Sequence, residues 1–134
     1  MAEETTDHAL RAHLDMPIEK ALPRVESALK DEGFGVLTTI DVKATLKEKL
    51  DIDFRSYRIL GVCNPSLALQ TLRANLDAGL LLPCHVILYE EGGGTEVAIL
   101  DPLSVLCVGD GLGIGIVVAE ARNQLQRVAE ALTD

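Results

Sequence analysis

A glycine run between two short apolar segments constrains this chain more than any other feature. The apolar segments cover residues 83–89 and 95–100, and Glu90-Glu91-Gly92-Gly93-Gly94 joins them. Consecutive glycines supply the positive φ angles that a hairpin loop needs. A parallel crossover takes a dozen or more residues, so this short connection predicts two neighbouring antiparallel strands.

Three further segments predict strands. Residues 6–14 alternate between two faces, with His8, Leu10, Ala12 and Leu14 on one of them, which is the period of a strand. The other two predicted strands cover residues 34–40 and 57–63. The chain therefore contains about five strands.

Proline and glycine positions predict a long helix near each end of the chain. Pro17 opens the first, over residues 17–32, and Gly33 ends it. The second covers about residues 114–132 and carries one apolar stripe. The stripe consists of Val117, Ala121, Leu125, Val128 and Leu132.

Two shorter helices are inserted between the strands. Asp41 is placed to cap the first, over residues 42–50, and Asn64-Pro65 opens the second, which we expect to end at Gly79. The residues expected to face inward are Leu46 and Leu50 in the first and Ala68, Leu72 and Leu76 in the second.

These elements predict a single domain over residues 1–134, of the α+β class. One antiparallel-type sheet of about five strands follows the order strand, helix, four strands, helix, and the long C-terminal helix packs on it. The later strands are apolar on both faces, through Leu60, Val62, Ile87, Tyr89, Ala98 and Leu100. Either the second face forms a homodimer or the inserted helices cover it.

Composition excludes several classes of function. The net charge of −9 leaves no basic stripe for nucleic acid, and 3% aromatic residues without Trp cannot build stacking platforms. The longest apolar stretch, residues 111–119, is far shorter than the roughly 20 residues that span a bilayer. The acidic first residues show no secretory signal, so we expect a soluble cytoplasmic protein.

The strongest candidate site combines Cys63 with Cys84. Cys63 precedes the helix start at Asn64-Pro65, where free N–H groups and the helix dipole favour an anion and can lower a thiol pKa. If their strands are neighbours, the two thiols lie at one edge of the sheet, where they could form a reversible disulfide or bind a thiophilic ligand. The alternative is that both are small buried side chains.

A metal site is disfavoured by the spacing of its candidate ligands. Such a site would add His85 and Cys107 to Cys63 and Cys84, but Cys84 and His85 are adjacent, so on a strand they point to opposite faces. We therefore expect no metal and no cofactor. His8 and His13 make no pair.

Two other features have simpler explanations than chemistry. Asp41 could be a catalytic carboxylate, but a helix cap is the commoner use of such a residue. The run from Gly109 to Gly115 matches neither phosphate-binding pattern, since it lacks Lys and Ser or Thr and contains Asp110. It is more typical of a hinge before the last helix.

Three segments together resemble a known family. They are Gly33-Phe34-Gly35-Val36-Leu37-Thr38 running into Ile40-Asp41-Val42-Lys43, then Tyr57-Arg58-Ile59-Leu60-Gly61-Val62-Cys63-Asn64-Pro65, then Gly79-Leu80-Leu81-Leu82-Pro83-Cys84. Their order and spacing resemble the small domains numbered 302 among the domains of unknown function. The resemblance implies a TATA-binding-protein-like fold with extra helices, a tendency to dimerise and no assigned activity. This chain has His85 where the family more often has Asn, so the resemblance assigns no role to that histidine.

Three functions remain open from the sequence. The first is a small-molecule or sulfur-species binding module with Cys63, Asn64 and Cys84 lining a cleft. The second is a thiol-dependent redox enzyme with Cys63 as the reactive thiol and Cys84 as its partner. The third is a structural dimeric module that acts through protein contacts alone.

Overall fold

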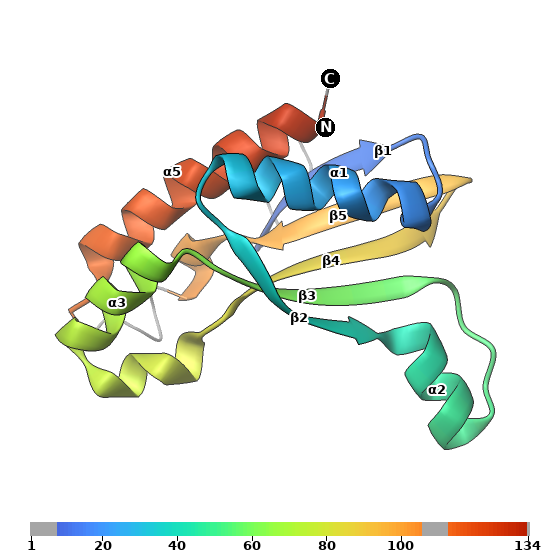
Figure 1. The fold of residues 1–134 in the computed structure, drawn as a ribbon, viewed down its shortest axis with the longest axis horizontal. Helices are drawn as coiled ribbons and strands as arrows, with labels where there is room; N and C mark the ends of the chain where they lie inside the picture. Colours follow the sequence, from blue (N-terminus) through green and yellow to red (C-terminus); the bar gives the residue numbers. More distant parts are fainter. Residues whose placement is uncertain (1–7, 106–112, 134) are drawn as a thin grey trace.

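Five antiparallel strands form one sheet in the order β1-β5-β4-β3-β2 (Figure 1). The computed structural model describes residues 8–105 and 113–133. The strands are β1 (Ala9–Leu14), β2 (Gly35–Asp41), β3 (Tyr57–Cys63), β4 (Cys84–Glu91) and β5 (Gly94–Leu100). The helices are α1 (Ile18–Asp31), α2 (Val42–Leu50), α3 (Pro65–Ala74) and α5 (Gly115–Leu132), with short 3-10 helices η2 (Leu76–Leu81) and η3 (Pro102–Val105). The predicted α+β class with one antiparallel sheet is confirmed.

The β4–β5 hairpin forms as its glycines predict. Glu91 pairs with Gly94, and the two residues between them, Gly92 and Gly93, have φ angles of 59° and 82°. Two consecutive positive φ angles define the tight hairpin turn whose twist matches that of the strands.

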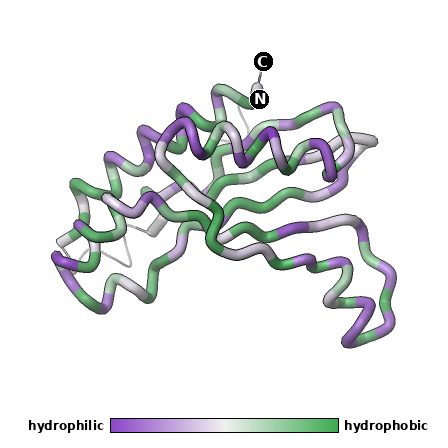
Figure 2. Tube along the Cα trace, in the orientation of Figure 1, coloured by the Kyte–Doolittle hydropathy of each residue, from purple (hydrophilic) through white to green (hydrophobic). Residues whose placement is uncertain are grey.

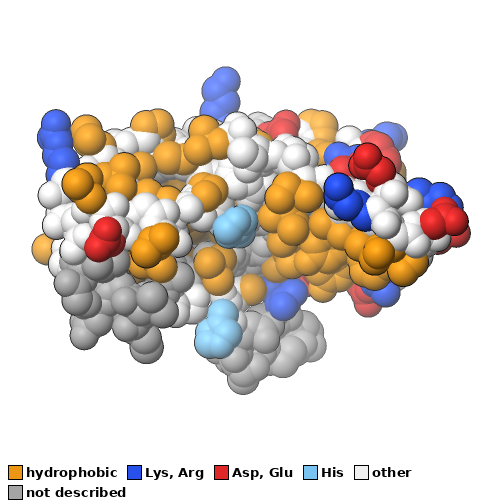
Figure 3. Space-filling view, turned by 90° about the horizontal axis from the view of Figure 1, so that it is seen from below, with side chains coloured by type: hydrophobic (Ala, Val, Ile, Leu, Met, Phe, Trp, Pro, Cys, Tyr) orange, Lys and Arg blue, Asp and Glu red, His pale blue; other side chains and the backbone are white. Residues whose placement is uncertain are grey.

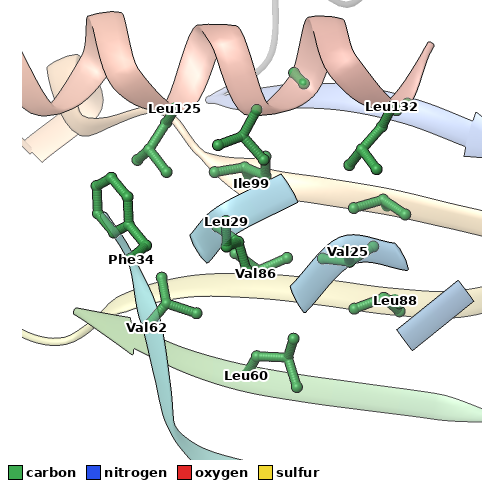
Figure 4. Close-up of a cluster of buried hydrophobic side chains, with 14 of the residues drawn as sticks. Val25, Leu29, Phe34, Leu60, Val62, Val86, Leu88, Ile99, Leu125 and Leu132 are labelled. Carbon is green, nitrogen blue, oxygen red and sulfur yellow. The ribbon is translucent and has the colours of Figure 1, made fainter. Parts of the chain in front are cut away.

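Helices α1 and α5 pack side by side on one face of the sheet and enclose the main core (Figures 1 and 4). Alternate residues of β3, β4 and β5 point into this layer, which is the period of a strand. The buried side chains there include Leu60, Val62, Val86, Leu88, Val97 and Ile99 from the sheet and Val25, Leu29, Leu125 and Leu132 from the helices. Figure 2 shows how strongly hydrophobic the central strands are.

The opposite face of the sheet, called the open face below, is not covered by the inserted helices. Helix α2 extends beyond one end of the strands and α3 lies beyond the other (Figure 1). The sequence left two explanations for the apolar second face, a homodimer or coverage by the inserted helices. Coverage by α2 and α3 is therefore wrong.

Helix α2 has the predicted bounds but not the predicted burial. None of its residues is buried, and Leu50, expected to face inward, is 61% exposed. Leu46 is half-buried. The cap at Asp41 and the αL residue Asp51 fix where the helix begins and ends, but neither gives it a surface to pack against.

Helix α3 is shorter than predicted. It ends at Ala74 because Asn75 is extended, with φ −165°, and the Asn75 side chain accepts a hydrogen bond from the N–H of Asp77 to start η2. The buried residues of α3 are Leu67 and Thr71, not the expected stripe. Of that stripe, Ala68 and Leu72 are half-buried and Leu76 is 84% exposed.

The stripe on α5 is largely as predicted. Ala121, Leu125, Val128 and Leu132 are buried, but Val118 is buried where Val117 was expected. No described helix has the length and apolar character to cross a membrane.

Candidate functional site

An apolar cavity of about 70 Å³ lies where β3 ends and β4 begins, between α3, η2 and the start of α5. Its lining residues come from widely separated parts of the chain, and none carries a charged side chain. They are Phe34, Val62, Cys63, Asn64, Leu67, Ala68, Thr71, Leu81, Leu82, Cys84, Leu100, Pro102, Ile114, Val117, Val118 and Ala121. The cavity separates the main core from a smaller cluster of Ala78, Ile114, Val118 and Leu81.

Strand pairing brings both predicted cysteines to this cavity. Strands β3 and β4 are neighbours, and Val62 lies opposite Cys84, one residue before Cys63. Both thiols are free and half-buried, and both line the cavity. The two cysteines therefore lie at one end of the neighbouring strands β3 and β4.

Burial changes the chemistry of one of these thiols. Burial raises the pKa of the Cys84 thiol above its ordinary value, and the nearby Cys63 raises it further. Apolar surroundings disfavour the thiolate, which is the nucleophilic and metal-binding form. Cys84 is therefore a neutral thiol near pH 7 and a poor nucleophile.

Asn64 is used mainly as a helix cap, the first of its two predicted roles. Its Oδ1 accepts hydrogen bonds from the N–H groups of Ser66 at 3.1 Å and Leu67 at 3.3 Å. Its Nδ2 donates to Gln124 Oε1 at 3.0 Å, which ties the start of α3 to α5. A Cβ at Gly33 would lie 3.0 Å from Nδ2, so the glycine leaves room for this amide.

The site predicted from the sequence includes only three of the sixteen lining residues, and Phe34 and Thr71 are among those it lacks. Thr71 is buried, and its hydroxyl donates to the carbonyl of Leu67 at 2.7 Å. The hydroxyl proton is therefore not free to bond to a ligand. The spacing of four between these two residues could have placed Thr71 on the buried face of α3. Nothing local marks Phe34, which reaches the cavity because Gly33, with φ +86°, turns the chain after α1.

The other candidate residues lie away from the cavity. Asp41 caps α2 by accepting from the N–H of Ala44 at 2.9 Å, which confirms the simpler of its two explanations. His13 faces Glu96 at 3.3 Å, and His85 is exposed opposite Gly61. Within residues 8–105 and 113–133, no group of three or more His, Cys, Asp or Glu could hold a metal ion. Cys107 and residues 109–112 of the glycine run lie outside the described residues.

Comparisons with known proteins agree with this architecture. Residues 10–132 match the profile of the family described as domain of unknown function DUF302. The crystal structure of an uncharacterized conserved DUF302 protein from Bacillus stearothermophilus is similar, with a TM-score of 0.84 and 29% identity over 93% of this chain and 98% of that one. No curated protein matches the chain significantly.

Proposed function

Because the chain belongs to DUF302, a family whose description assigns no activity, we propose its function from the cavity: it binds a small, uncharged molecule between Cys63 and Cys84. A sulfur species is the ligand class that suits two neighbouring thiols best, because sulfur is soft and polarizable.

The chemistry of the lining carries this proposal. A volume of about 70 Å³ admits only a small molecule, since roughly 10–15 Å³ of such space holds one water. A charged ligand would lose its hydration without gaining a counter-ion from the lining, which is strongly unfavourable. The side chains of Asn64 and Thr71 already make internal hydrogen bonds, so the free surface offered to a ligand is apolar carbon and sulfur.

A thiol-dependent redox function is less well supported. In such an enzyme the partner thiol attacks as a thiolate to close the disulfide, and burial slows this step because it raises the pKa of Cys84. The binding proposal instead needs both thiols reduced, a state that a reducing compartment such as the cytoplasm maintains.

Xenon, a neutral apolar probe, tests whether the cavity binds. We expect xenon pressure to shift the backbone amide resonances of α3 and of the start of α5 in the wild-type protein. Ala68→Leu fills the cavity and should abolish these shifts. Ala74→Leu makes the same change at an exposed site on the same helix and should leave them intact. Unchanged shifts in Ala68→Leu, or none in the wild type, would refute the proposal.

Native mass spectrometry of freshly purified protein tests the role of the thiols. We expect a small mass adduct in the wild type and its loss in the double variant Cys63→Ser, Cys84→Ser. An adduct retained equally by both proteins would show that the cysteines do not hold the ligand.

A further inference from the structure

We propose that a second copy of this chain pairs with the free edge of β2, so that two sheets join around a two-fold axis into one. This inference concerns a surface away from the cavity and does not depend on what the cavity binds. Strand β2, helix α2 and residues 51–56 together are called the arm below.

Strand β2 is an edge strand without the usual protection. Among the residues that the structure describes, it ends the strand order and pairs with no strand other than β3. Residues 35–40 contain no charge and no proline, the residues that commonly block edge pairing. One bulge falls between Val36 and Thr38, after which the register with β3 is regular to Asp41. The opposite edge, β1, carries Arg11 and His13.

The arm also exposes apolar side chains. Leu37 is 64% exposed, Ile40 48%, Leu50 61%, Ile52 48% and Phe54 40%. Figure 3 shows hydrophobic side chains on the half of the molecule that carries the arm, as well as on the other half. Several exposed apolar side chains on one segment are typical of an interaction surface.

An apolar row on the open face leads to the same edge. Ile40 lies opposite Ile59, which lies opposite Ile87. Because cross-strand partners share one face of a sheet, the three isoleucines form a continuous row that ends at β2. Pairing of two β2 strands would join the rows of both copies.

The distribution of charge identifies the occupant as a second copy. The arm, residues 35–56, carries four Lys and Arg against four Asp and Glu, a net of 0, so the chain's net charge of −9 lies on the remaining residues. Two copies therefore repel each other in most relative orientations, but not when their arms meet. Antiparallel pairing of the β2 strands of two copies would hydrogen-bond the backbone groups along the free edge. Residues 35–40 are uncharged, so this pairing places no like charges opposite each other.

Light scattering after size-exclusion chromatography, at about 150 mM salt, tests the proposal. We expect the wild type at twice its chain mass of 14.4 kDa. Leu37→Lys places like charges across the paired edges and should weaken dimerisation by about 100-fold or more, which yields a monomer at micromolar concentration.

The matched control is Leu80→Lys, at a leucine that is 87% exposed in η2, at the other end of the molecule. This variant should remain a dimer. Circular dichroism establishes that both variants fold, and Ile40→Lys provides a second edge variant should Leu37→Lys unfold. A monomeric wild type, or a dimer that persists in a folded edge variant, would overturn the proposal.

Discussion

Replacing Gly61 by alanine tests the close approach that positions the cavity strands. Gly61 lies in the middle of β3, and a Cβ there would be 2.5 Å from Thr38 Oγ1 and 2.9 Å from Pro83 Cγ. Both distances are below ordinary contact, and Pro83 directly precedes Cys84. The added methyl group must therefore push β2 or the start of β4 away.

The expected loss of unfolding free energy follows from two opposing effects. Overpacking of this kind costs about 1–3 kcal/mol, whereas a Gly→Ala change recovers about 0.4–1 kcal/mol by restricting the unfolded chain. We expect Gly61→Ala to lower the free energy of unfolding by about 1–2 kcal/mol. Urea unfolding followed by far-UV circular dichroism measures this value.

Gly35→Ala is the matched control, because no described atom beyond Gly35 and its two chain neighbours lies within 4 Å of the position of its Cβ. It should be neutral or stabilising by up to about 1 kcal/mol. Adding Thr38→Ala to Gly61→Ala removes the nearest contact and should recover part of the loss. Equal unfolding free energies for the Gly61 and Gly35 variants would refute the steric argument.

Three further predictions follow from the site and the core. Asn64→Ala removes the cap of α3 and the bond to Gln124, so urea unfolding should show a loss of about 1–3 kcal/mol, larger than for the exposed cap variant Asp41→Ala. Because its folded-state pKa is raised, Cys84 keeps its proton where the unfolded chain loses it, so its contribution to stability is complete below pH about 8.5 and declines above it. The urea midpoint should therefore fall less between pH 8 and pH 10 in Cys84→Ala than in the wild type. Leu125→Ala opens a cavity in the main core and should cost about 2–5 kcal/mol by the same assay, whereas a loss under 1 kcal/mol would place this side chain outside the core.

Features set by neighbouring residues were predictable from the sequence. The β4–β5 hairpin depends on the φ angles of Gly92 and Gly93, and the starts of α2 and α3 depend on the caps Asp41 and Asn64. Each of these signals acts over two to four residues, so no knowledge of the fold was needed to read it.

Features set by distant parts of the chain were not predictable. Leu50 follows a helical apolar spacing but is 61% exposed, because α2 extends past the sheet. The cavity combines Phe34 and Thr71 with both cysteines only through strand order and the path of α3. That Cys63 and Cys84 lie near each other was predictable, because each lies at the end of a predicted strand. Which residues enclose them was not.

The pairing of β1 with β5 has a consequence for biosynthesis. Ala9 lies opposite Leu100, so the first strand to leave the ribosome must wait for the last one before it can hydrogen-bond. Closing such a long loop slows folding and leaves β1 unpaired throughout translation. A nascent chain stalled before residue 94 would therefore present an incomplete sheet to chaperones and proteases.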